Sequence, residues 1–339
     1  MPVNLVSKQK IKIFIAGAYG MVGSAIVRAY EKVNLEGEES YELLIPKKTD
    51  LDLTNFWEVE NWFKKNKPQF VIIAAAKVGG IYANLTYPYD FILNNLKIQT
   101  NIIEISNKYK VKKLLFLGSS CIYPRLSLQP ISEEYLLKGD LEKTNEYYAI
   151  AKITGIKLCQ SLHKQKGLNA ISLMPTNLFG PGDNYNPTQS HVLAAFIHKF
   201  VDAKKRKLKE VTCWGTGKPM REFLFVDDLA EACIFVMRNW SLDDTSAPRD
   251  DNGEILYWLN VGSEEEISIK DLAKKVANMV QFEGRILWDI SKPDGTPRKK
   301  LNNSRINKLG WNATTSLNSG IFKTIKAYEE EIEKNILRF

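Results

Sequence analysis

Apolar residues fall into short, nearly uninterrupted runs along the first half of the chain, and longer amphipathic stretches separate these runs. Such runs predict strands that are buried on both faces, as in a parallel sheet covered by helices. The amphipathic stretches predict a helix that begins near Met21 and helices over residues 87–109 and 148–163. The predicted strands are residues 11–16, 41–45, 69–76, 113–117 and 170–173. This alternation predicts an α/β fold with a Rossmann-type doubly wound parallel sheet.

The alternation becomes less regular after Pro175. Residues 180–190 and 241–253 are rich in loop-forming residues, and the second segment has the Asp, Ser and Pro content of a surface connection. We therefore expect residues 1–180 to form the Rossmann-type domain. Residues 181–339 should form mainly a smaller C-terminal α/β lobe that binds substrate, with some segments returning to the first domain.

The composition is that of an ordinary globular protein with a large core, since 44% of the 339 residues are hydrophobic and 25% are charged. The formal net charge is +8, and it includes no polybasic tail. The longest basic run, residues 204–207, follows a predicted helix and is typical of a solvated helix end. We expect no nucleic-acid partner, and the mild positive charge suits an anionic ligand such as a nucleotide diphosphate.

The four cysteines are widely separated and form no CxxC pair, which argues against a metal site and a disulfide framework. They are Cys121, Cys159, Cys213 and Cys233. Residues 1–10 are polar and lack the apolar core of a signal peptide. No segment approaches the roughly 20 apolar residues of a membrane span. We therefore expect a cytoplasmic protein with no metal and no membrane partner.

A glycine-rich loop follows the first predicted strand. Its sequence, Gly17-Ala-Tyr-Gly20-Met-Val-Gly23, opens the first predicted helix. Small residues let the backbone approach a pyrophosphate, and a helix N-terminus favours its negative charge. A tight turn alone needs no ligand, but the placement between strand and helix favours dinucleotide binding.

The end of the second predicted strand indicates which dinucleotide is bound. An acid at this point favours NAD, and a basic residue favours the 2′-phosphate of NADP. The chain has Lys47 and Lys48 here and no acid before Asp50. The pattern favours NADP(H). The structural alternative is that Lys47 and Lys48 are simply two exposed lysines in a turn.

Tyr148 and Lys152 are four residues apart on a predicted helix and so share one face. A nearby cation favours the phenolate, so we expect Lys152 to lower the pKa of Tyr148 and make it a usable proton carrier. Ser119 and Ser120 end the fourth predicted strand, where active groups of open α/β sheets gather. The structural alternative for the Tyr148–Lys152 pair is an ordinary helix with one exposed lysine.

Five longer strings extend the pattern through nearly the whole chain. They are residues 75–80 (AAKVGG), 118–124 (GSSCIYP), 174–178 (MPTNL), 219–223 (PMREF) and 292–299 (KPDGTPRK). With the glycine loop and Tyr-x-x-x-Lys, they resemble the GDP-L-fucose synthase family of extended short-chain dehydrogenases/reductases. The chain departs from some bacterial members of that family, which carry a basic residue where it has Tyr19.

The resemblance implies a homodimeric enzyme that acts on a GDP-sugar. It would epimerise GDP-4-keto-6-deoxy-D-mannose at carbons 3 and 5 and then reduce the 4-ketone with NADPH, giving GDP-L-fucose. Cys121 and His191 would be the acid/base pair, and Tyr148 the proton donor in reduction, assisted by Lys152 and Ser119. The implied substrate contacts are Lys199, Trp214, Arg221 and Asp294. The expected NADP(H) contacts are Gly17, Gly20, Met21, Val22, Gly23, Lys48, Leu117, Gly118, Ser119, Ser120, Lys152, Pro175, Thr176, Asn177, Leu178 and His191.

Several residues have a structural alternative. Cys121 fits a small buried residue, His191 fits a helix N-terminus with only a structural hydrogen bond, and Trp214 fits the core equally well. Asp227 and Asp228 are better explained as a helix cap than as catalytic groups. Two other functions remain open. One is a nucleotide-sugar 4-epimerase or dehydratase that recycles bound NAD, and the other is a non-catalytic dinucleotide sensor.

Overall fold

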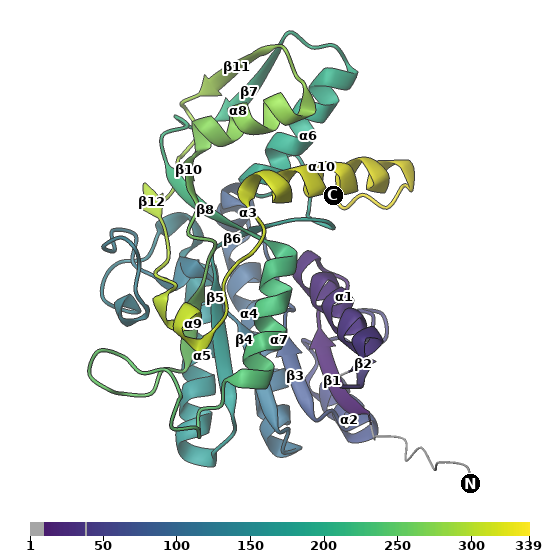
Figure 1. Ribbon diagram of the computed structural model, residues 1–339, viewed down its shortest axis with the longest axis vertical. Coiled ribbons are helices and arrows are strands. Elements are labelled where there is room, and N and C mark those ends of the chain that lie inside the picture. The colour runs from purple at the N-terminus through teal and green to yellow at the C-terminus, as the bar shows by residue number, and fades with distance from the viewer. Residues whose placement is uncertain (1–9, 38) are drawn as a thin grey trace.

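The computed structural model describes residues 10–37 and 39–339. A sheet domain forms the lower part of Figure 1, and a smaller lobe lies above it. The sequence predicts no signal peptide in the polar segment 1–10. Residues 1–9 of this segment lie outside the described residues.

Six parallel strands form the main sheet in the order β2-β1-β3-β4-β5-β9. Their bounds are β1 Ile11–Ala16, β2 Tyr41–Leu44, β3 Phe70–Ile73, β4 Lys113–Leu117, β5 Ala170–Pro175 and β9 Trp258–Val261. The predicted doubly wound fold is therefore confirmed. The strands predicted over 41–45 and 69–76 end earlier than expected. The strand order reverses direction between β1 and β3, which creates the crevice where open α/β sheets bind ligands.

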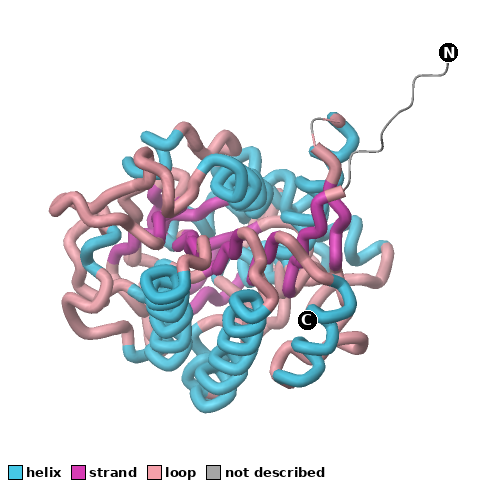
Figure 2. The backbone as a smooth tube through the Cα atoms, turned by 90° about the horizontal axis from the view of Figure 1, so that it is seen from below, coloured by secondary structure: helices cyan, strands magenta, loops and turns pink. Residues whose placement is uncertain are grey.

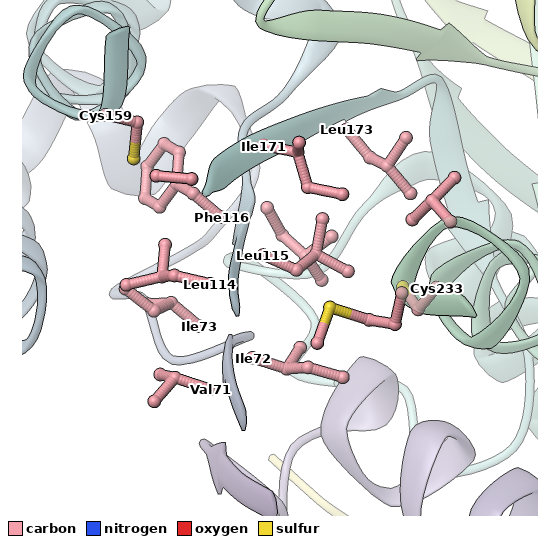
Figure 3. Packing of buried hydrophobic residues seen from close by; sticks show 14 of the residues in the cluster. Val71, Ile72, Ile73, Leu114, Leu115, Phe116, Cys159, Ile171, Leu173 and Cys233 are labelled. Atoms are coloured by element: carbon pink, nitrogen blue, oxygen red, sulfur yellow. The ribbon is translucent and has the colours of Figure 1, made fainter. Parts of the chain in front are cut away.

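Helices cover both faces of this sheet (Figure 2). Helices α1 (Met21–Glu36) and α7 (Val226–Asn239) pack together on one face, and α4 (Pro88–Lys108) and α5 (Glu146–Lys166) pack together on the other, with α2 (Phe56–Asn66) beside α4. Figure 3 shows that side chains of one strand pack against both helix layers. Leu114 and Phe116 of β4 lie on the side of Cys159 in α5, whereas Leu115 lies on the side of Cys233 in α7.

The smaller lobe has its own apolar core, built around residues such as Phe196, Phe200 and Val276. Its strands are β6 Asn177–Phe179, β7 Glu210–Trp214, β8 Met220–Phe225, β10 Glu266–Ser268, β11 Arg285–Asp289 and β12 Arg298–Lys299. Its helices are α6 Val192–Lys205, α8 Ile269–Val280 and α10 Leu317–Glu333. Of the shorter helices, α3 (Ile81–Thr86) lies between β3 and α4 in the chain, and α9 (Ser304–Leu309) lies between β12 and α10.

Two segments from the second half of the chain join the main domain, since β9 pairs with β5 and α7 packs on α1. The expectation that Asp227 and Asp228 cap α7 is wrong. Phe225 is the N-cap residue, and both acids lie in the first turn. Asp228 instead accepts hydrogen bonds from the Thr315 backbone N–H at 3.1 Å and hydroxyl at 2.9 Å. Within residues 10–37 and 39–339, the helices are too short or too polar to cross a membrane.

Candidate active site

The glycine loop between β1 and α1 comes so close to other backbone that two of its glycines cannot carry a side chain. A Cβ on Gly17, whose φ is +84°, would lie 2.7 Å from the Ala75 backbone, and a Cβ on Gly23 would lie 2.0 Å from the Gly17 carbonyl oxygen. Gly20 is different, because its Cβ would come no closer than 3.4 Å to any protein atom outside the neighbouring residues. Gly20 is the N-cap of α1, and the first turn of α1 carries no acid. This open helix N-terminus, with the N–H groups of Met21 and Val22, fits a pyrophosphate.

Tyr19 connects the glycine loop to the end of β2, where Lys47 and Lys48 follow in the chain. The Tyr19 hydroxyl donates to the Ile45 carbonyl oxygen at 3.3 Å, just beyond the end of β2. Lys47 and Lys48 are exposed. Asp50, the first acid after these lysines, accepts with Oδ2 from the Lys47 backbone N–H at 3.3 Å. The turn therefore presents lysine ammonium groups, which fit a 2′-phosphate.

The segment that follows β5 joins the main sheet to the smaller lobe. Pro175 ends β5, and the Thr176 hydroxyl and the Asn177 amide both donate to the Glu222 carbonyl oxygen of β8, at 3.3 and 2.7 Å. Leu178 belongs to β6, which pairs with β8. The expected cofactor contacts at 175–178 thus lie where the two parts of the molecule meet.

Tyr148 and Lys152 lie on one face of α5, as the spacing predicts. The Lys152 Nζ donates to the Leu117 carbonyl oxygen at 2.8 Å and lies 5.7 Å from the centroid of the Tyr148 ring. Burial lowers the pKa of Lys152 to about 8. Burial also raises the pKa of Tyr148, and a negative charge on Cys121 raises that pKa further. The expectation of a lowered tyrosine pKa is therefore wrong, because burial of the phenol disfavours its charged form.

Ser119 and Cys121 share the short helical turn that follows β4. Ser119 is the N-cap of this turn, and its Oγ accepts from the Cys121 backbone N–H at 3.3 Å. The hydroxyl hydrogen of Ser119 can therefore point to a substrate oxygen. Cys121 is 7% exposed and lines a small cavity with Glu142 and Lys299. Burial raises the pKa of the Cys121 thiol, whereas the charge of Lys299 is the largest influence that lowers it.

Lys299 is a candidate that our sequence reasoning did not select, although it ends the string 292–299. It lies on β12, and its backbone neighbour in the parallel pair with β8 is Arg221. Burial lowers the pKa of Lys299 to about 8, with a smaller contribution from Arg221. Because the positive charge of Lys299 also acts on His191, this lysine connects the two residues of the expected acid/base pair.

His191 is the N-cap residue of α6, but its ring forms no capping hydrogen bond. The structural alternative, a helix N-terminal residue with only a structural hydrogen bond, is right about the position of His191, but the expected cap hydrogen bond is absent. The His191 side chain is exposed to solvent. Desolvation by the surrounding protein lowers its pKa, and Lys299 lowers it further. The neutral imidazole is thus favoured near neutral pH, as a proton acceptor requires.

The four expected substrate contacts form a row across the smaller lobe. The Lys199 Nζ donates to the Thr212 carbonyl oxygen at 2.9 Å and lies 5.4 Å from the Trp214 ring. Trp214 is 42% exposed, so the core alternative is wrong. Burial lowers the pKa of Arg221 to about 10. The Arg221 Nη2 donates to the Asp294 carbonyl oxygen at 3.4 Å.

The Asp294 carboxylate is already engaged within the lobe. It accepts from the Thr216 backbone N–H at 2.8 Å and the Thr216 hydroxyl at 2.7 Å. Asp294 therefore holds the turn after Trp214 against the backbone beside Arg221. Lys299 continues this row to the cavity of Cys121.

Comparisons with known proteins indicate the family to which the chain belongs. The sequence model of the NAD dependent epimerase/dehydratase family matches residues 13–246. GDP-L-fucose synthase 1 of Arabidopsis thaliana is 49% identical over 97% of each chain, and GDP-L-fucose synthase of Escherichia coli K12 is 46% identical over 96% of this chain and 98% of its own. A solved GDP-L-fucose synthetase from Naegleria fowleri bound to NADP is 26% identical over 96% of each chain, with a TM-score of 0.81. The chain belongs to the NAD dependent epimerase/dehydratase family and, within it, to the GDP-L-fucose synthases.

Proposed function

We propose that this chain converts GDP-4-keto-6-deoxy-D-mannose to GDP-L-fucose, by epimerisation at carbons 3 and 5 followed by NADPH-dependent reduction of the 4-ketone. One observation carries the proposal beyond family membership. A thiol and a phenol, Cys121 and Tyr148, lie close enough at the carboxyl edge of one sheet for the charge of the first to raise the pKa of the second. The site therefore holds two proton-carrying groups of different acidity, as the two steps require.

Epimerisation needs one group that removes a proton and one that returns it on the opposite face of the sugar. The protons on carbons 3 and 5 are acidic because each of these carbons flanks the same carbonyl. We assign the two roles to Cys121 and His191. The charge of Lys299 acts on both, since it opposes the effect of burial on the pKa of Cys121 and lowers the pKa of His191. The Ser119 and Tyr148 hydroxyls can stabilise the enolate oxygen by donating hydrogen bonds to it.

Reduction needs a proton donor beside the ketone oxygen. NADPH, when bound along the glycine loop, supplies the hydride. Tyr148 suits the donor role because burial keeps its phenol protonated near neutral pH. Lys152, which is fixed to the end of β4, can replenish the proton or stabilise the phenolate after transfer.

The row of substrate contacts suits a long, anionic substrate. We assign the nucleotide base to the exposed face of Trp214 beside Lys199, and the diphosphate to Arg221, whose guanidinium can bind phosphate oxygens bidentately. The sugar would then lie between Lys299 and Tyr148. Asp294 would act by holding the turn after Trp214, unless the substrate displaces Thr216 from it.

The test is NADPH oxidation by the purified protein with GDP-4-keto-6-deoxy-D-mannose, followed by identification of the product by NMR. The expected result is one NADPH consumed for each GDP-L-fucose formed. A protein that retains tightly bound NAD and turns over without consuming NADPH would be a 4-epimerase or dehydratase instead. Binding of NADPH without any turnover would support the dinucleotide sensor.

We further propose that residues 1–180 form the cofactor domain and residues 181–339 mainly the substrate lobe. The separate core of the smaller lobe supports this division. We also propose a cytoplasmic homodimer, and the four buried free thiols suit a reducing compartment. Exposed Tyr82, Tyr87 and Tyr89, at the beginnings of α3 and α4, suit an interface between copies. Light scattering during size-exclusion chromatography should give twice 38.7 kDa, and the monomer mass would contradict the dimer.

A further inference from the structure

The loop that carries His191 is held against a pair of glycines that follow β3. The Gly80 backbone N–H donates to the Gln189 carbonyl oxygen at 2.8 Å. The loop is also fixed internally, because the Asn186 Oδ1 accepts from the Gln189 backbone N–H at 3.1 Å and the Ser190 N–H donates to the Asn186 carbonyl oxygen at 3.1 Å. The position of His191 is therefore set by a compact loop resting on Gly80.

Gly80 leaves no room for a side chain on the face that meets this loop. A Cβ at residue 80 would lie 2.6 Å from the Ser190 carbonyl oxygen and 3.3 Å from that of Gln189. Both are backbone atoms and cannot rotate away. Gly80 has φ −67° and ψ −178°, which any residue adopts without strain. Its own conformation therefore does not require glycine, whereas the close approach of the loop does.

The turn that holds Gly80 is itself fixed. The side chain of Asn84, which is 7% exposed, donates from Nδ2 to the Gly79 carbonyl oxygen at 2.8 Å and to the Gly80 carbonyl oxygen at 3.0 Å. The backbone at residue 80 is thus held in place. A side chain added there would therefore displace the 189–191 loop and not the turn that carries residue 80.

We propose that Gly80 is a positioning residue that holds His191 in the active site. Its contact with the loop keeps the imidazole within the field of Lys299, the residue that also lines the cavity of Cys121. The catalytic consequence rests on the proposed epimerase function, but the positioning itself does not. Because AAKVGG follows β3 at the sheet crevice, this turn ties the acid/base residue of the smaller lobe to the cofactor domain.

The test compares Gly80→Ala with Gly79→Ala. A Cβ at residue 79 would press on the Ala83 and Phe91 side chains, at 2.9 and 3.2 Å, but would make only an ordinary contact of 3.6 Å with the Gln189 carbonyl oxygen. The two variants add the same methyl group to neighbouring positions, and only Gly80→Ala pushes directly on the loop. Circular dichroism and NADPH binding show whether each variant is folded.

The readout is the titration of His191, followed by NMR of 15N-histidine-labelled protein. The chain has only three histidines, so His191→Asn assigns the signal. Gly80→Ala should raise the pKa of His191 toward its ordinary value, because a displaced imidazole lies farther from Lys299 and from the surrounding protein. Gly79→Ala should leave the His191 titration where it is in the unaltered protein. In deuterated water, Gly80→Ala should also slow deuterium entry at carbons 3 and 5 by about 100-fold, the cost of a displacement of roughly 1 Å.

An unshifted His191 titration in folded Gly80→Ala would overturn the proposal. Should Gly80→Ala not fold, Asn84→Ala takes its place, because it frees the support without adding atoms, and an unshifted His191 titration there overturns the proposal equally. Failure of the unaltered protein to exchange deuterium at all would instead count against the epimerase function, and the titration would still decide the role of Gly80.

Discussion

Replacing Lys299 by Met removes one positive charge from the cavity of Cys121 and keeps a side chain of similar length. Burial raises the pKa of the thiol, and Lys299 is the largest opposing influence. A positive charge at close range lowers the pKa of an acid by about 1–3 units. The pKa of Cys121 should therefore rise in Lys299→Met, and the thiolate fraction at neutral pH should fall by roughly 10-fold or more.

Alkylation by iodoacetamide as a function of pH measures this change without any substrate, because only the thiolate reacts. Cys121 is the most accessible of the four cysteines, since the other three are fully buried. The matched control is Lys292→Met, which removes a charge 5.5 Å from the Trp214 ring and outside the residues that line the cavity. The control should alkylate like the unaltered protein. An unchanged pH profile in Lys299→Met would refute the electrostatic role of this lysine.

The lowered pKa of Lys299 adds a second consequence with a definite sign. At a pKa of about 8, the ammonium is charged below this pH and loses its charge above it. The electrostatic stabilisation of the Cys121 thiolate by Lys299 therefore weakens above about pH 8. Deuterium exchange at carbons 3 and 5 should level off or fall above this pH. Lys299→Arg, which stays charged, should carry the exchange activity to higher pH.

The remaining predictions test the other assigned roles. Tyr148→Phe should slow ketone reduction by roughly 10²–10⁴-fold, the range for a lost general acid, while leaving the melting temperature nearly unchanged; near-normal NADPH oxidation would remove Tyr148 from the mechanism. Cys121→Ser should reduce deuterium uptake at both carbons, since a hydroxyl is a far weaker acid than a thiol, and unchanged uptake would make Cys121 a structural residue. Lys48→Glu should weaken NADPH binding much more than NADH binding in a fluorescence titration, and equal losses would show that Lys48 does not contact the 2′-phosphate.

The sheet was predictable because its strands are buried on both faces. The strands over 11–16 and 113–117 have the predicted bounds, since almost every residue in them packs against one helix layer or the other. Helix α2 was not predicted, because it is short and about half of its residues are charged or exposed. A local signal was present, however. Asn55 caps this helix by accepting from the backbone N–H groups of Trp57 and Glu58, and an Asn followed three residues later by Glu is typical of a helix start.

The membership of the site was partly predictable, but its electrostatics were not. Spacing brought Tyr148 and Lys152 together, because four residues make one helical turn. The direction of the Tyr148 pKa shift depends on burial, which the spacing does not contain. Lys299 was not predicted, because it comes close to Cys121 and Arg221 only when β12 pairs with β8.

The coupling between Cys121 and Tyr148 explains how one site can serve two proton-transfer reactions. Two acids this close cannot both ionise easily, so the negative charge settles on the group with the better support. Lys299 favours charge on the thiol, whereas a charged thiol raises the pKa of the phenol. When Cys121 is ionised, it can therefore accept protons from carbon during epimerisation, while Tyr148 keeps the proton that reduction requires. Reduction before epimerisation would end the reaction, because the acidity of carbons 3 and 5 disappears with the carbonyl. A protonated Tyr148 alone would not prevent that early reduction, so the order of the steps must come from how the sugar is presented to the hydride donor.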